Sequence, residues 1–213
     1  MARGFVITLL GAESTGKTTL AEVLAAALSA SLPAQHIAVV TEYLREFCEQ
    51  QQRTPRQDEQ AGIAAEQTRR IEAAALTHDI VVADTSALMI AVYSEHVFGD
   101  TSLYASALAA QTGFELTLLT ALDLPWLADG LQRDGPHVRE PVDAALRKAL
   151  AGAKLGYSVV AGNGGARLNN ALACVQRALA PPAPEAASSA RWSWHCERCG
   201  DANCERHALL PRT

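Results

Sequence analysis

The stretch Gly11-Ala-Glu-Ser-Thr-Gly-Lys-Thr18 decides the fold of this chain. It follows the apolar run Phe5-Val-Ile-Thr-Leu-Leu10 and leads into an Ala/Leu-rich segment, from Thr18 to Ser31, whose spacing is helical. The pattern G-x-x-x-x-G-K-[ST] between a strand and a helix is the P-loop, whose glycines let successive main-chain N–H groups point inward. Those groups and the positive end of the helix attract phosphate, so the sequence predicts a binding site for ATP.

The P-loop supplies the predicted nucleotide ligands. Lys17 is expected to bridge the β- and γ-phosphates, and the Thr18 hydroxyl is expected to bind Mg²⁺. The alternative is a glycine-bearing strand-to-helix turn without a ligand, which the position of the motif disfavours. The full set of predicted ligands is Gly11, Ser14, Thr15, Gly16, Lys17, Thr18 and Thr19.

Apolar runs and helical segments alternate along the rest of residues 1–180. Four further strands are predicted at 36–41, 79–84, 114–122 and 158–162. Helices are predicted at 43–52, 55–76, 86–96, 102–111, 141–155 and 167–179, with a turn at 163–165. This alternation predicts an α/β fold of the P-loop nucleoside triphosphate hydrolase class, nucleoside-kinase-like, with a five-stranded parallel sheet flanked by helices.

Two acidic residues stand where predicted strands end. Asp84 is expected to bind Mg²⁺, directly or through water, or to take the proton of the accepting hydroxyl; the alternative is a cap of the following helix. Glu42 is expected to hold a sugar hydroxyl or to act as the base. Arg45, one turn further on, either meets a phosphate or pairs with a carboxylate.

A polar stretch, residues 129–140, joins the fourth strand to the next helix and is predicted to be a lid or a binding loop. It holds Arg133 and Arg139, one of which is expected to stabilise charge on the migrating phosphoryl group, unless both are solvated surface residues. After the last strand, the main chain of residues 162–165 is expected to approach the adenine, or to form only a tight turn.

Composition favours a small-molecule partner. A chain of 213 residues, about half of them apolar, is long enough for one α/β domain with a short appendage. The net charge of -5 and the mixing of both signs argue against a protein that coats nucleic acid. No segment approaches the roughly 20 apolar residues of a membrane span, and the N-terminus lacks a signal-peptide layout, so we expect a cytoplasmic protein without a membrane partner.

The end of the chain is predicted to bind zinc. Residues 181–191 form a Pro/Ala/Ser-rich linker after the domain of residues 1–180. The tail, residues 192–213, has the spacing Cys-x2-Cys-x4-Cys-x2-His, enough for a tetrahedral structural Zn²⁺ site in a reducing compartment. Its predicted ligands are Cys196, Cys199, Cys204 and His207, with His195 as a rival. The alternative is a disordered tail with incidental thiols.

Over most of residues 5–180 the chain resembles the ribosylnicotinamide kinase domain of the bacterial NadR proteins and related small P-loop ATPases of the AAA family. The resemblance rests on residues 11–19, on Glu42-Tyr-Leu-Arg-Glu-Phe47, on Ile80-Val-Val-Ala-Asp-Thr85 and on residues 117–133. It implies ATP-dependent phosphorylation of nicotinamide riboside, a step of NAD biosynthesis, with Asp84 and Glu42 near the ribose and residues 129–139 as the lid.

The chain departs from the NadR pattern in two ways. The adenylyltransferase domain that NadR proteins also carry is not expected here, because the first strand begins at residue 5. Thr41 stands where the family tends to have an aromatic residue suited to stacking on a pyridinium ring. A different nucleoside therefore stays open as the acceptor. A second hypothesis is a regulatory switch ATPase whose zinc knuckle docks to protein or nucleic acid.

Overall fold

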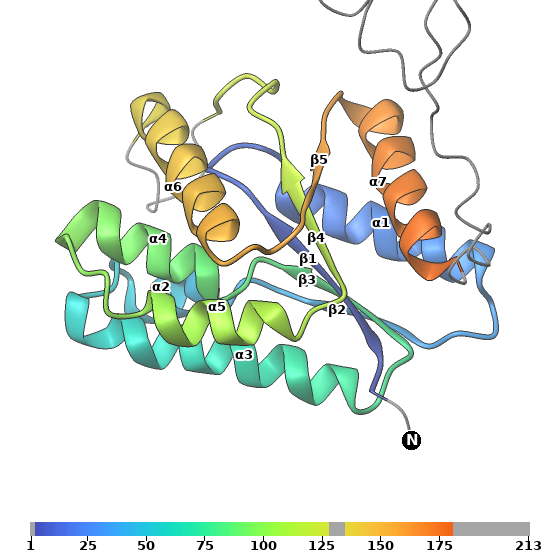
Figure 1. The fold of residues 1–213 in the computed structure, drawn as a ribbon, viewed down its shortest axis with the longest axis horizontal. Coiled ribbons are helices and arrows are strands. Elements are labelled where there is room, and N and C mark those ends of the chain that lie inside the picture. Colours follow the sequence, from blue (N-terminus) through green and yellow to red (C-terminus); the bar gives the residue numbers. More distant parts are fainter. Residues whose placement is uncertain (1–2, 128–134, 181–213) are drawn as a thin grey trace, which may run out of the picture. The chain divides into compact units, whose positions relative to one another are not determined.

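The computed structural model describes residues 3–127 and 135–180 of the chain (Figure 1). Its contacts divide the chain after Ala178, and the fold is that of the unit before this point.

Within the described residues, five strands form one sheet in the order β2-β3-β1-β4-β5. Every neighbouring pair is parallel, which confirms the predicted five-stranded parallel sheet. The C-terminal ends of all strands therefore lie at one edge, where α/β proteins of this type bind ligands. The strands are β1 (Phe5–Leu10), β2 (Ile37–Val40), β3 (Ile80–Asp84), β4 (Leu116–Thr120) and β5 (Ser158–Val160).

Helices connect the strands at the predicted places. They are α1 (Lys17–Ser31), α2 (Tyr43–Gln51), α3 (Gln60–Ala75), α4 (Ala87–Phe98), α5 (Tyr104–Thr112), α6 (Arg139–Gly152) and α7 (Gly164–Leu179), with 3-10 turns η1 (Gln57–Glu59) and η2 (Pro136–Val138). No helix of the described ranges combines the length and the apolar character that crossing a bilayer requires.

Three of the helix starts that differ from the predictions have a local reason. The helix predicted from residue 55 begins with η1 instead, because the Glu59 carboxylate accepts from the Arg56 N–H and caps the turn. Helix α6 begins at Arg139, two residues early, since η2 leads straight into it. Helix α7 includes residues 164 and 165 of the predicted turn, because the Asn163 carbonyl already accepts from the N–H of residue 166.

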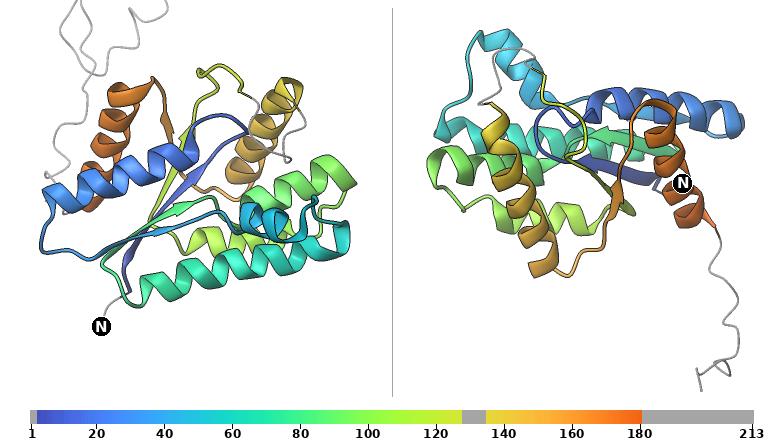
Figure 2. Two further views of the ribbon diagram at one scale, coloured as in Figure 1. Left: turned by 180° about the vertical axis from the view of Figure 1, so that it is seen from behind. Right: turned by 90° about the horizontal axis from the view of Figure 1, so that it is seen from above.

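Helices cover both faces of the sheet, with α1 and α7 on one side and α3 to α6 on the other (Figures 1 and 2). Alternate residues of β1 enter opposite layers: Ile7 and Leu9 pack in the cluster that contains Leu24 of α1, whereas Val6 packs in the cluster that contains Ile71 of α3. Because helices cover both faces of the sheet, its C-terminal edge is the place where a ligand can reach it.

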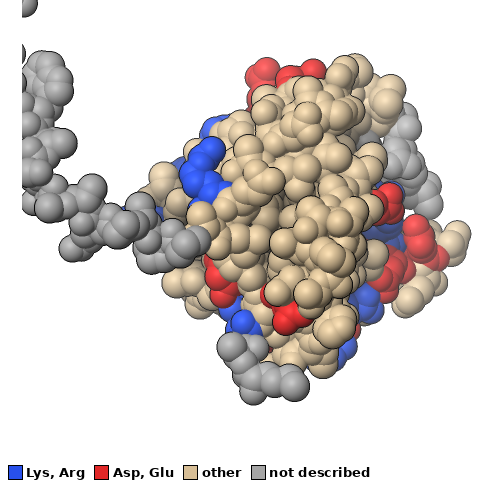
Figure 3. All heavy atoms as spheres, turned by 90° about the vertical axis from the view of Figure 1, so that its right-hand side faces the viewer, with Lys and Arg blue, Asp and Glu red and all other residues tan. Residues whose placement is uncertain are grey.

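Charged side chains are sparse on the face of the molecule to which α1 and α7 belong (Figure 3). A nucleic-acid backbone is usually bound by clustered Lys and Arg. In this view the charged side chains lie mainly toward the rim, with both signs close together, so this face offers no extended basic surface.

Candidate phosphate-binding site

At two positions the loop between β1 and α1 has a backbone conformation that favours glycine. Gly11 has φ +149°, and a Cβ built on it would lie 2.1 Å from Thr120 Oγ1 of β4. Gly16, the N-cap residue of α1, has φ +74°, in the left-handed region. The curled loop predicted from the P-loop pattern is therefore the conformation that the chain adopts.

Two hydroxyls of the loop form hydrogen bonds to β4 and to the segment that follows it. Thr15 Oγ1 donates to the Ala12 carbonyl at 2.8 Å and shares a hydrogen bond of 2.7 Å with Thr120 Oγ1. Ser14 Oγ accepts from the Leu127 N–H at 2.8 Å and donates to the Leu127 carbonyl at 3.1 Å. These side chains, predicted as nucleotide ligands, thus hold the loop in shape.

Lys17 lies at the first turn of α1, and its Nζ donates to the Ala12 carbonyl at 3.0 Å. The ammonium group therefore folds back along the loop that precedes its own helix. Thr19, the last predicted ligand, is exposed in the first turn of α1.

Thr18 and Asp84 are brought together by the pairing of β1 with β3. The register sets Asp84 beside Leu9, and the Thr18 hydroxyl donates to Asp84 Oδ2 at 2.6 Å. Asp84 is 2% exposed, and its Oδ1 is buried without a hydrogen-bond partner in the described part of the chain. A hydroxyl and a carboxylate are hard oxygen donors, and Mg²⁺ usually takes one or two of these from protein and the rest from water and phosphate. The pair fits Mg²⁺.

Thr85, directly after Asp84, has an unusual backbone that the sequence does not signal. Its φ is +77°, which is rare for a β-branched residue, and its buried Oγ1 has no hydrogen-bond partner among the described residues. The next residue, Ser86, is the N-cap of α4 and accepts from the Leu88 N–H. The alternative in which Asp84 caps this helix is therefore wrong.

Glu42 and Arg45 follow the end of β2. Glu42 occupies the N-cap position of α2, and its side chain is 17% exposed. Arg45 Nε lies 3.9 Å from Glu42 Oε2, so Arg45 forms the ion pair with a carboxylate that the sequence left as one of two alternatives.

Arg139 differs from its predicted setting. It is the first residue of α6 rather than part of a loop, and at 8% exposed it is not a solvated surface arginine. Nε and Nη2 are buried without a hydrogen-bond partner in the described residues. Helix α6 lies beside the loop between β1 and α1 (Figures 1 and 2), and its Val142 shares a core cluster with Ala12 of that loop. Buried guanidinium nitrogens that lack a hydrogen-bond partner among the described residues are costly, so the position suits an anion.

The sequence profile of the AAA domain family matches residues 6–167, about three quarters of the chain. The chain belongs to the AAA domain family. No curated protein matches it in sequence.

Solved structures share the fold of this AAA domain. A NadR protein in complex with NR superposes with a TM-score of 0.66 at 21% identity, over 82% of this chain and 51% of the NadR chain. The chain therefore spans about half the length of that protein. A thymidylate kinase from Ehrlichia chaffeensis superposes with a TM-score of 0.58 at 14% identity, over 83% of this chain and 99% of the kinase. The predicted resemblance is thus confirmed for family and fold.

An ion pair that the sequence did not predict joins the segments that follow β4 and β5 in this AAA domain. Asp123, after β4, accepts from the Gly162 N–H at 2.5 Å and from Arg167 Nη2. Arg167 is buried, which lowers its pKa, and its Nε donates to the Gly162 carbonyl at 2.8 Å. Gly162 is thus occupied by these two side chains, and the predicted adenine contact would have to come from residues 163–165. Nothing in their spacing pairs Asp123 with Arg167, 44 residues apart.

Several residues for which the sequence predicts a role lie outside the residues that the structure describes. They are Arg133, the linker at 181–191 and the zinc ligands Cys196, Cys199, Cys204 and His207. Across residues 3–127 and 135–180, no group of three or more His, Cys, Asp or Glu could hold a metal ion. The zinc tail stays a prediction.

Proposed function

We propose that this chain is an ATP- and Mg²⁺-dependent kinase that phosphorylates a small nucleoside-like compound, with the ribose 5′-hydroxyl of nicotinamide riboside as the leading acceptor. The observation that carries the proposal is the Thr18–Asp84 hydrogen bond of 2.6 Å beside a fully formed P-loop. Further support comes from the folds it resembles, a thymidylate kinase and a NadR protein in complex with NR.

Nucleotide binding would use the first turn of α1 and the loop before it. The main-chain N–H groups of residues 11–18 and the Lys17 ammonium group would hold the β- and γ-phosphates. Thr18 and Asp84 would hold Mg²⁺, which when bound to ATP neutralises charge that develops between the β- and γ-phosphates.

The acceptor would lie between the P-loop and the start of α2. Its hydroxyl oxygen forms a bond to the γ-phosphorus while the bond from that phosphorus to the β-phosphate oxygen breaks, and ADP leaves. The hydroxyl proton passes to Asp84 or to Glu42, the carboxylates at the ends of the neighbouring strands β3 and β2.

Arg139 would stabilise the negative charge of the migrating phosphoryl group. Its Nε and Nη2, which have no hydrogen-bond partner within residues 3–127 and 135–180, are the groups to which an anion would bind. Arg133, in the preceding segment, remains the other candidate for this role.

The test is a phosphorylation assay with the full chain, ATP, Mg²⁺ and a panel of acceptors. Nicotinamide riboside and the common nucleosides are compared by ADP release and by mass spectrometry of the product. We expect ADP release that depends on nicotinamide riboside, with its mononucleotide as the product. Slow hydrolysis of ATP that no acceptor accelerates would contradict the proposal and would favour the regulatory switch.

A further inference from the structure

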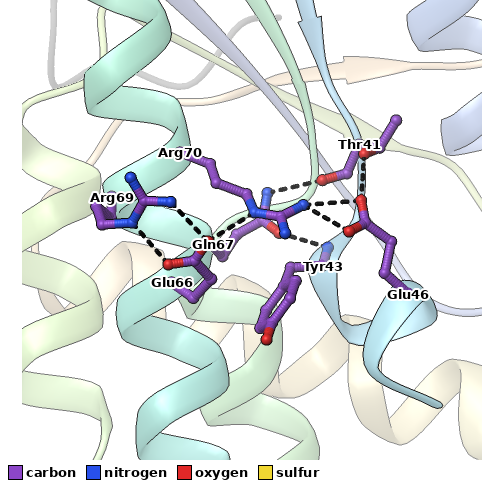
Figure 4. Close-up of polar contacts among 7 residues, drawn as sticks. All are labelled: Thr41, Tyr43, Glu46, Glu66, Gln67, Arg69 and Arg70. Carbon is purple, nitrogen blue, oxygen red and sulfur yellow. Dashed lines mark hydrogen bonds and ion pairs between the residues drawn. The ribbon is translucent and has the colours of Figure 1, made fainter. Parts of the chain in front are cut away.

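A buried glutamine of α3 holds the junction between β2 and α2 (Figure 4). The Gln67 side chain is fully buried, and its Oε1 accepts from the Tyr43 N–H at 2.7 Å. Its Nε2 donates to the Thr41 carbonyl at 3.3 Å. Thr41 and Tyr43 are the residues on either side of Glu42, so one amide group hydrogen-bonds to the main chain both before and after this residue.

Arg70, one turn further along α3, reinforces the same junction (Figure 4). Its Nη1 donates to both oxygens of Glu46, at 2.8 and 2.7 Å, and its guanidinium lies 4.3 Å from the centroid of the Tyr43 ring. Thr41 Oγ1 also donates to Glu46, at 2.9 Å. The hydrogen bond from Arg70 is the main reason that the pKa of Glu46 is lowered. The first turn of α2 is thereby bound to α3 by a charged pair as well as by Gln67.

Helix α2 begins without a cap from its own N-cap residue. The first N–H groups of a helix have no partner inside the helix, and a side chain at the N-cap position usually accepts from them. Glu42 stands at that position but makes no such hydrogen bond. Gln67 accepts from the first N–H of α2 in its place. The Glu42 carboxylate is therefore not used to cap its own helix.

We infer that Gln67 is a positioning residue for Glu42: by capping α2 from a neighbouring helix, it sets the orientation in which Glu42 meets the phosphate acceptor. The inference rests on the proposed function, since it assigns Glu42 to the acceptor. The contacts of Gln67 lie on the junction between β2 and α2 and not on the P-loop, so Gln67 affects acceptor binding and leaves ATP binding unchanged.

The test replaces the amide with a side chain of similar length, in Gln67→Met. The KM for nicotinamide riboside should rise about tenfold, the effect of one or two lost hydrogen bonds to buried groups, while the KM for ATP stays within about twofold. The matched control is Gln60→Met, at a buried glutamine on the same helix that makes neither of these bonds, and it should leave both KM values within about twofold. A rise in the KM for ATP equal to that for nicotinamide riboside would overturn the inference.

A double-mutant cycle shows whether Gln67 acts through Glu42. In a Glu42→Gln background, Gln67→Met should change the KM for nicotinamide riboside by less than about twofold, because the carboxylate that it positions is already gone. If the two changes instead multiply, Gln67 does not act through Glu42. If Gln67→Met does not fold, Gln67→Glu keeps an oxygen for the Tyr43 N–H, and it should raise the same KM by about threefold.

Hydrogen exchange separates this inference from the proposed function. Gln67→Met should speed exchange of the amides of residues 42–46, and Gln60→Met should not. If the wild-type chain phosphorylates no nicotinamide riboside, the proposed function fails, and faster exchange at these amides alone would still support Gln67 as the cap of α2. Unchanged exchange would overturn the capping role whatever the activity.

Discussion

The Thr18 hydroxyl donates a hydrogen bond of 2.6 Å to Asp84, although 66 residues separate the two in the chain. Thr18 belongs to the first turn of α1, and Asp84 ends β3. The parallel pairing of β1 with β3 brings these ends together, so the proposed Mg²⁺ site depends on the register of two strands as much as on the P-loop.

Asp84→Asn should lower kcat by ~10²–10³-fold, since the amide keeps the shape of the carboxylate but loses its charge and its basicity. Thermal unfolding should change little, because the new side chain still offers an oxygen to Thr18. The measurement is steady-state kinetics with nicotinamide riboside. Asp79→Asn, next to the opposite end of the same strand, is the control and should retain activity. Equal losses in both variants would mean that charge at Asp84 has no special role.

Lys17→Ala should abolish turnover without unfolding the domain, because the ammonium group is replaced at a partly exposed position. Affinity for ATP, measured by calorimetry, should fall as well. Lys148→Ala removes the same charge at an exposed position of α6 that is not part of the P-loop, and it should leave the kinetics unaltered. Turnover by the Lys17 variant at more than about a tenth of the wild-type rate would exclude a role on the phosphates.

Gly11→Ala should destabilise the domain and abolish ATP binding. The new Cβ would meet Thr120 Oγ1 at 2.1 Å, and alanine rarely adopts φ +149°, which together cost about 1–3 kcal/mol. Gly62→Ala is the matched control: it lies inside α3 with open space around it, so the same substitution should stabilise the domain by about 0.5–1 kcal/mol. Both effects are read from urea unfolding. Similar behaviour of the two variants would contradict the close approach at Gly11.

Arg139→Met should separate stability from activity. Arg139 Nε and Nη2 are buried without a hydrogen-bond partner in the part of the chain that the structure describes, so loss of this side chain's charge should leave the free energy of unfolding unchanged or raise it, while kcat falls by about 10²-fold. Arg139→Lys should retain more activity than Arg139→Met. The control is Arg147→Met on the same helix, which breaks the ion pair with Asp143 and should leave kcat near the wild-type value. A loss of both stability and kcat at Arg139 would indicate a structural role.

The ion pairs of Arg70 should stabilise the folded state at neutral pH but not in acid. Hydrogen bonds from Arg69 and then Arg70 lower the pKa of Glu66 from 4.5 to about 2, and Arg70 lowers the pKa of Glu46. Carboxyl groups whose pKa is lower in the folded state stabilise it fully above pH 4.5 and progressively less as the pH falls toward 2. Arg70→Met should therefore lower the free energy of unfolding at pH 7 and have little effect near pH 2, in urea titrations at each pH. An effect independent of pH would show that packing of Arg70 on Tyr43 dominates.

Features formed by neighbouring residues were predictable. The P-loop is eight consecutive residues between a strand and a helix, and the five strands follow from short apolar runs that alternate with helical segments. Helix starts were predicted less well, as at Arg139 and Gly164, because capping depends on single hydrogen bonds that periodicity does not carry.

The sequence by itself determined the phosphate loop and the alternation of strands and helices, because the conformational preferences of glycine and the periodicity of apolar side chains act over a few residues. Only the tertiary structure decided which charged groups meet. The Thr18–Asp84 contact, the Asp123–Arg167 pair and the cap that Gln67 provides for α2 each join separate elements, through the strand order and the packing of α3 on α2. Arg139 is buried for the same reason: the packing of α6 in the core, rather than its neighbours in the chain, removes it from water.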